Sequence, residues 1–142
     1  MILAVAALVG ADIGHAPFGR YPAPIVRTAR AAPPRLTDPL SRRYRSALRT
    51  AAARPADFAG HWVLAAIGCG AGCIRPAAID RTTGRVAWFP ASVSGWPLAV
   101  QEPLTYRRDS RLLVVQGMLD EREPSATRAY LFDGRRFTLL PG

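Results

Sequence analysis

The two cysteines are the residues of this chain whose type and spacing most directly suggest chemistry. Cys69 and Cys73 lie in the stretch GCGAGC, which begins at Gly68, and they are the only cysteines among the 142 residues. Such a pair can form a disulfide, bind a metal ion or supply a reactive thiol. A disulfide between them closes a small ring, for which loop entropy predicts a stabilisation of about 2 kcal/mol. Because glycine adopts the backbone angles that a tight ring requires, we expect a disulfide that staples a turn between two strands.

The alternatives to a disulfide both depend on His61. A zinc site needs three or four protein ligands, and apart from the thiols the chain offers only two histidines and scattered carboxylates. A nucleophilic cysteine needs a base such as His61, which an acid such as Asp80 would orient. The spacing selects neither arrangement, and the common nucleotide-binding and hydrolase motifs are absent. We therefore expect no metal and no cofactor, and we keep a thiol-dependent enzyme, or a redox or metal protein, using Cys69 or Cys73 with His61 as the alternative function.

The positive charge of the chain is concentrated in its first part. The formal net charge is +9, and all 19 basic side chains are arginine. Seven of the nine net charges fall before residue 56, so the remainder is almost neutral. A basic amphipathic helix can bind anionic lipid or nucleic acid, which makes an anion-binding module a further alternative. We do not expect nucleic acid as a partner, because the arginines of such a helix also serve simply as its solvated face.

The first 36 residues predict a leader followed by a linker. Residues 1–11 are uncharged and apolar and end in small residues, as signal peptides do. Membrane contact is expected only through this segment. Residues 12–36 contain five prolines and show no helical or strand period, which predicts a flexible, extended linker. Export to the periplasm or beyond the cell would place both cysteines in an oxidising compartment.

Residues 37–142 predict a single domain of the α+β class. Thr37 or Asp38 can cap a helix, and Leu40, Tyr44 and Leu48 then recur at helical spacing with arginines between them. From residue 62 onward, short apolar runs alternate with turn residues, a pattern typical of strands joined by hairpins. We expect an N-terminal amphipathic helix packed on an antiparallel β-meander of about six strands.

An aromatic loop completes the candidate binding surface. Trp88, Phe89 and Trp96 stand in a stretch rich in proline, serine and glycine, and aromatic side chains in loops are enriched where proteins bind partners. The alternative is that the tryptophans lie under the loop and cover part of the core. We expect one surface that combines this loop with the cysteine turn and the histidine: His61, Gly70, Ala71, Gly72, Trp88, Phe89 and Trp96.

Four short motifs occur in a fixed order along the chain. They are FAGH from Phe58, GCG-x-x-C from Gly68, D-x-x-T-G from Asp80 and DSRLL from Asp109. In this combination the chain resembles a group of small exported bacterial proteins of unknown function. The resemblance covers about residues 40 to 140 and implies export and a compact β domain; it implies no activity.

These features together favour a binding protein without enzymatic activity. We expect a periplasmic or secreted domain whose partner is another envelope or extracellular protein. A disulfide-closed loop between strands is rigid, and rigidity lowers the entropic cost of binding. An inhibitor of an envelope protein would have this design.

Overall fold

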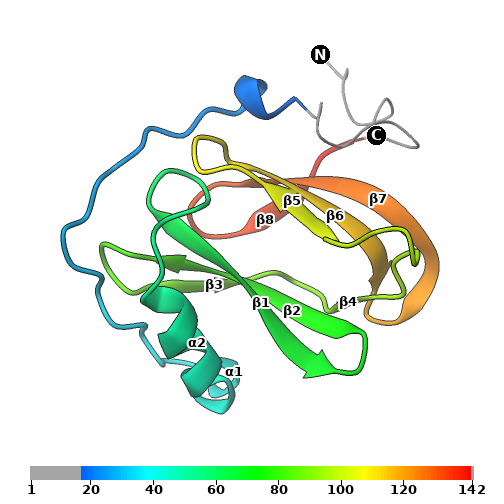
Figure 1. Cartoon of the computed structure of the whole chain (residues 1–142), viewed down its shortest axis with the longest axis horizontal. Coiled ribbons are helices and arrows are strands. Elements are labelled where there is room, and N and C mark those ends of the chain that lie inside the picture. Colours follow the sequence, from blue (N-terminus) through cyan, green and yellow to red (C-terminus); the bar gives the residue numbers. More distant parts are fainter. Residues whose placement is uncertain (1–16, 142) are drawn as a thin grey trace.

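The computed structural model describes residues 17–141, so the predicted signal peptide lies outside the described residues. The chain forms mostly antiparallel β-sheet with few helices, in broad agreement with the predicted α+β class (Figure 1). The helices are α1 (Pro39–Arg43) and α2 (Arg45–Ala52), and the strands are β1 (Trp62–Gly70), β2 (Cys73–Asp80), β3 (Val86–Trp88), β4 (Val93–Ser94), β5 (Leu104–Tyr106), β6 (Leu112–Leu119), β7 (Arg122–Phe132) and β8 (Phe137–Leu139). The described strands number eight rather than six, because β4 (VS) and β5 (LTY) contain no continuous apolar run from which a strand could be predicted.

The sheet consists of two halves that are joined by β4. All strand pairings are antiparallel, in the order β1-β2-β4-β6-β7-β8, with β3 paired to β2 and β5 paired to β6. β4 pairs with the start of β2 on one side and with the end of β6 on the other. The main core lies between the halves: Trp62 and Leu64 of β1 belong to the same buried cluster as Leu113 of β6 and Phe132 of β7. β1 and β5 therefore belong to opposite halves, which matters for the site described below.

Strand β1 is apolar because both of its faces are buried over most of its length. Side chains alternate between the two faces of a strand. Leu64 faces the core between the halves, whereas Val63, Ala65 and Ile67 contact Leu48 of α2 in a second buried cluster. A continuous apolar run rather than an alternating one is the expected pattern for such a strand.

The predicted helix is present as two short helices. Asp38 caps α1, accepting hydrogen bonds from the backbone N–H of Ser41 at 2.8 Å and from its hydroxyl at 2.7 Å. The helical path is interrupted at Tyr44, which ends α1 and precedes α2. Leu48 is fully buried against β1 and β2. No helix among residues 17–141 is long and apolar enough to cross a membrane.

The segment from residue 17 to residue 36 is extended, but it is not the separate linker that its prolines suggested. Phe18, in a 3₁₀ turn, is buried against Leu112 and Val114 on the outer face of β6. The hydroxyl of Ser110 lies 2.8 Å from the carbonyl oxygen of Phe18. Further on, the backbone N–H of Arg35 donates to the carbonyl of the β2–β3 turn at 2.8 Å. The segment thus wraps one side of the domain on its way to α1 (Figure 1).

Candidate functional site

A disulfide staples the turn between β1 and β2, as predicted. Cys69 and Cys73 are bonded, with their Cα atoms 5.1 Å apart. The strand register shifts between Gly68 and Gly70, and both Gly70 (φ 134°) and Gly72 (φ 64°) have positive φ. A Cβ atom at Gly70 or Gly72 would meet no atom within 4 Å. The glycines are therefore needed for the backbone conformation of the turn, and the turn itself projects from the domain.

A second exposed segment lies beside this stapled turn. β4 pairs with Cys73 and Ile74, so the residues that follow Ser94 run alongside those that precede Cys73. Trp96 is half-buried against the core, whereas Leu98 is fully exposed, with a relative accessibility of 105%. We call the stapled turn (69–73) and the segment 95–98 the stapled end. Nothing in the sequence distinguished Leu98 from the other leucines, because its exposure results from the loop's path.

Two of the predicted surface aromatics do not belong to this end of the molecule. Phe89 is buried, at 2% exposure, in the core between the sheet halves, where it contacts Tyr130 edge-to-face. Trp88 lies under α1: its indole N–H donates to the hydroxyl of Ser41 at 3.0 Å and its ring contacts Tyr44. The prediction that both residues line a binding surface is wrong, because Trp88, at the end of β3, packs against the helix and Phe89, which follows it, packs in the core.

His61 is separated from the cysteines by the length of β1. Eight residues lie along the strand from His61 to Cys69, and at about 3.3 Å per residue this corresponds to roughly 26 Å. The structure therefore does not bring His61 together with either cysteine, and both cysteines are in the disulfide. Among residues 17–141, no group of three histidine, cysteine, aspartate or glutamate side chains is arranged to hold a metal ion.

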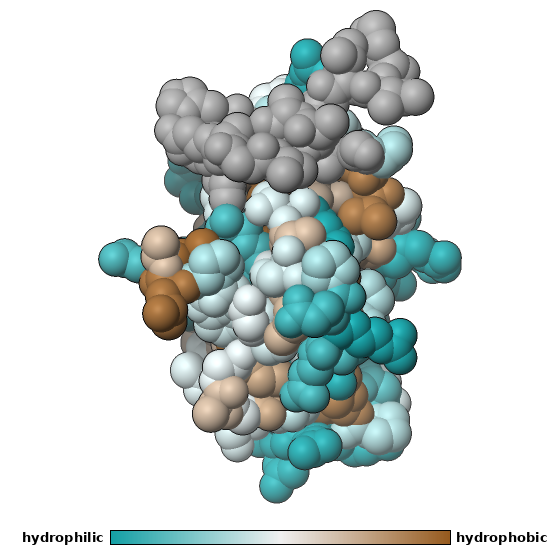
Figure 2. All heavy atoms as spheres, turned by 90° about the vertical axis from the view of Figure 1, so that its right-hand side faces the viewer, coloured by the Kyte–Doolittle hydropathy of each residue, from teal (hydrophilic) through white to brown (hydrophobic). Residues whose placement is uncertain are grey.

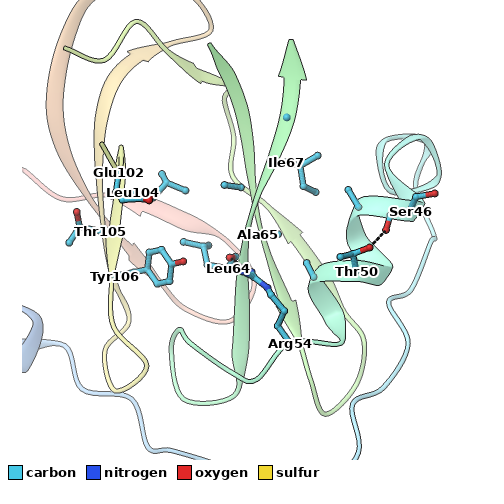
Figure 3. Close-up of a pocket in the computed structure, with 14 residues that line it drawn as sticks. Ser46, Thr50, Arg54, Leu64, Ala65, Ile67, Glu102, Leu104, Thr105 and Tyr106 are labelled. Atoms are coloured by element: carbon cyan, nitrogen blue, oxygen red, sulfur yellow. Dashed lines mark hydrogen bonds between the residues drawn. The ribbon is translucent and has the colours of Figure 1, made fainter. Parts of the chain in front are cut away.

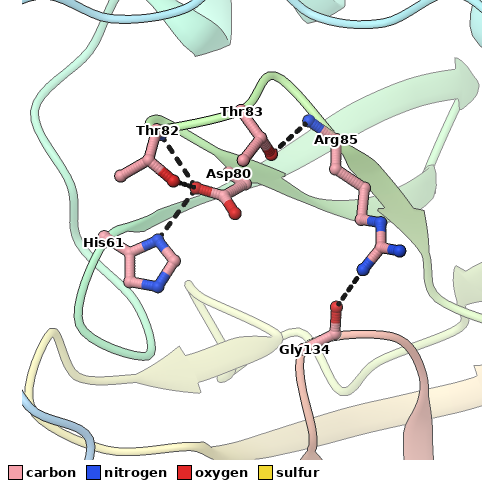
Figure 4. A network of polar contacts seen from close by, with 6 residues as sticks. All are labelled: His61, Asp80, Thr82, Thr83, Arg85 and Gly134. Carbon is pink, nitrogen blue, oxygen red and sulfur yellow. Dashed lines mark hydrogen bonds and ion pairs between the residues drawn. The ribbon is translucent and has the colours of Figure 1, made fainter.

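His61 instead belongs to a polar network that fixes the turn after β2 (Figure 4). Its Nδ1 lies 2.8 Å from Oδ1 of the buried Asp80. The same oxygen accepts hydrogen bonds from the N–H of Thr82 at 2.8 Å and from its hydroxyl at 2.6 Å. Burial raises the pKa of Asp80, but the hydrogen bonds from Thr82 and His61 outweigh it, and the pKa lies below its ordinary value. The ionised Asp80 thus joins the start of β1 to the β2–β3 turn.

A groove of about 940 Å³ runs along the free edge of β1. Figure 3 shows α2 on one side of the strand, with Ser46 and Thr50, and β5 on the other, with Leu104 and Tyr106. The floor is formed by Leu64 to Gly68 of β1. The groove was not predicted, because it depends on which strand of the sheet has only one neighbour.

In the part of the chain that the structure describes, side chains cap the edge of β1 at one position, Leu64. The carboxylate of Asp57 accepts from the backbone N–H of Leu64 at 2.8 Å, and Arg54 donates to the carbonyl of Leu64 at 2.9 Å. Burial is the main reason that the pKa of Asp57 is raised; the Leu64 N–H and the Arg54 charge oppose it. Asp57 and Arg54 thus make the hydrogen bonds to Leu64 that a neighbouring strand would otherwise make.

The stapled end and the β1 groove are the two candidate sites that the geometry offers. Figure 2 shows one face of the molecule, on which hydrophobic groups stand apart from one another among hydrophilic ones. On that face, a partner would contact separate hydrophobic side chains rather than one broad apolar area. No protein-family model, no curated protein and no solved structure matches the chain.

Proposed function

We propose that this protein is an exported binding domain, periplasmic or secreted, which holds another envelope or extracellular protein at its stapled end. The observation that carries the proposal is Leu98, a large apolar side chain that is completely exposed in the segment following β4, the strand that pairs with Cys73. A leucine in this position contributes nothing to the core, whereas its burial under a partner would contribute about 1.5–3 kcal/mol to binding.

The construction of the stapled end supports this function. The disulfide and the pairing of β4 with β2 hold both exposed segments on the same rigid sheet. A Cβ atom at Gly95 would collide with the side chain of Met118, so the segment passes close over β6. A preorganised surface loses little conformational entropy on binding. Inhibitors that insert a rigid loop into a target exploit the same principle.

The disulfide also supports the proposal that the protein works in the periplasm or outside the cell. Disulfides persist in the periplasm and outside the cell, whereas cytosolic thiols are kept reduced. The alternative, a thiol-dependent enzyme, requires a free cysteine within reach of a base. The bonded cysteines and the distant His61 provide neither, so binding accounts better for the described geometry.

A capture experiment with matched variants tests this function. The full chain is immobilised and exposed to the envelope fraction of its host, and the amounts of retained proteins are compared with those for Leu98→Arg, Ala71→Arg and Leu139→Arg. Leu139 is the control because it is also exposed, at 54%, but lies on β8. We expect the Leu98 and Ala71 variants to retain at least about tenfold less of a specific protein, as for anchor residues, and the Leu139 variant to behave as wild type. Equal retention by all variants, or no specific retention, would contradict the proposal.

A further inference from the structure

The backbone at the free edge of β1 is directed into the groove. Among the strands of residues 17–141, β1 is hydrogen-bonded to β2 alone, on one side. The bonds from Leu64 to Asp57 and Arg54 show that the backbone groups of Leu64 point away from β2. These groups alternate sides with a period of two along an antiparallel strand. The N–H and C=O groups of Ala66 and Gly68 therefore point away from β2 as well.

The strand register agrees with this orientation. Ala66 lies opposite Pro76 of β2, and proline has no N–H to offer. The carbonyl of Pro76 is directed to the other side, where it accepts from the N–H of Phe89 at 2.9 Å. Within residues 17–141, the outward groups of Ala66 and Gly68 make no hydrogen bond, and both residues are exposed.

Between Leu64 and Gly68, before the register shift at Gly70, this edge lacks the charged side chains and prolines that usually prevent strand addition. Soluble proteins protect exposed edges with charged side chains, prolines or a covering segment. β1 reads WVLAAIGCG, without a charge or a proline, and its protection by side chains ends at Leu64. The groove lies open along both faces of the edge, between α2 and β5. An added strand would thus find unpaired backbone groups and room for its side chains.

The two walls of the groove differ in chemistry. On the α2 side, Ser46 and Thr50 line the groove, and the exposed Arg45 and Arg49 lie on the same helix, in which no residue is acidic. On the β5 side the lining residues are Glu102, Leu104, Thr105 and Tyr106, so this wall combines two large apolar or aromatic side chains with one acidic residue at its end. An extended segment places alternate side chains on opposite faces. One set would face the basic helix, and the other would face the wall that contains Leu104 and Tyr106.

From this complementarity we propose that the β1 edge binds an extended segment of a partner protein in which acidic and apolar residues alternate, adding it to the sheet as a further strand. Backbone pairing of this kind supplies affinity, and the alternate side chains supply specificity. A second copy of this chain fits less well, because it would bring the same net charge of +9. The inference rests on the proposed function: Gly68 directly precedes Cys69, so one partner can contact the stapled end and the edge together.

The test is a nuclear magnetic resonance titration of the full-length, ¹⁵N-labelled chain with defined peptides. The probe is a blocked decapeptide that alternates valine or threonine with glutamate, and the first control replaces every glutamate by lysine. Two further controls carry N-methyl groups on either the glutamate or the apolar residues, which blocks the backbone donors of one peptide edge. We expect the glutamate peptide to shift the amide signals of Ala66 and Gly68. One of the two N-methylated peptides, but not the other, should bind at least about tenfold more weakly.

Two protein variants separate edge pairing from general attraction. Ala66→Glu places a charge on the edge and should weaken binding of the glutamate peptide at least about tenfold. Thr138→Glu makes the same change of charge on β8, the strand at the other end of the sheet, and should leave binding unchanged. Equal binding of the lysine peptide, or equal effects of both variants, would overturn the inference.

The remaining outcomes distinguish this inference from the proposed function. Signals of Ala66 and Gly68 that change on dilution without peptide would identify a second copy as the occupant and overturn the inference. No binding up to about 1 mM peptide, with Leu98-dependent capture intact, overturns the inference alone. Peptide binding at the edge without Leu98-dependent capture overturns the proposed function alone.

Discussion

Replacing Phe18 by alanine should show how much the N-terminal segment contributes to the domain. Phe18 is 2% exposed and lies against Leu112, Val114 and Ala129. A buried phenylalanine removes roughly 150–250 Å² from water, worth about 4–6 kcal/mol at about 25 cal/mol per Å². Alanine retains part of this area, and measured Phe→Ala changes in cores are about 3–5 kcal/mol. We therefore expect the free energy of unfolding to fall by about 3–5 kcal/mol.

Urea unfolding of the full chain, followed by circular dichroism, measures this change. Ile25→Ala is the matched control, because Ile25 belongs to the same segment but is 49% exposed; its effect should stay within about 0.5 kcal/mol. An equal slope of free energy against urea in both variants shows that the unfolding transition is comparable. If Phe18→Ala also stayed within about 0.5 kcal/mol of wild type, the reasoning that the segment is part of the folded core would be refuted.

Three further substitutions test individual parts of the fold. Exchange of both Cys69 and Cys73 for serine should lower the free energy of unfolding by about 2 kcal/mol while the circular dichroism of the sheet persists; loss of the sheet would show that the staple does more than close a turn. The pKa of Asp80 is lowered from 3.8 by folding, so its stabilisation is present above that value and is lost as the pH falls through the folded-state pKa. Asp80→Asn should therefore reduce the acid dependence of the urea midpoint, and an unchanged dependence would contradict this. Gly84 (φ 81°) and Gly134 (φ 92°) share a left-handed conformation, but only at Gly84 would a Cβ meet a backbone carbonyl, that of the N-terminal segment. Gly84→Ala should thus lower the thermal midpoint more than Gly134→Ala, and equal losses would argue against that contact.

The sequence predicted those parts of the fold that depend on local patterns. The cap at Asp38 and the spacing of Leu48 predicted a helix and its buried face, and the apolar runs predicted antiparallel strands. The N-terminal segment was misjudged because its burial depends on contacts distant in the sequence: Phe18 is held by Ser110, 92 residues away. Prolines indicate an extended backbone, but they carry no information about what that backbone contacts.

The candidate sites were predicted to different degrees for a similar reason. The disulfide follows from two cysteines on a glycine-rich turn, which is local information. The position of Phe89 in the core, the exposure of Leu98 and the free edge of β1 depend on strand order, to which local spacing is insensitive. His61 and Asp80 were paired only within the alternative of a nucleophilic cysteine; they do contact each other, but they fix a turn near the opposite end of β1 from the cysteines.

The central claim is that the stapled end is rigid and binds a partner rather than reacting chemically. Whether Cys69 and Cys73 are bonded to each other in the native protein tests this claim most directly. The measurement is the intact mass of the protein isolated from the envelope fraction of its own host, after treatment with iodoacetamide with and without prior reduction. The structure predicts no adduct without reduction and one on each of Cys69 and Cys73 after it. An adduct on folded, unreduced protein would contradict the stapled end and would favour a thiol-dependent activity.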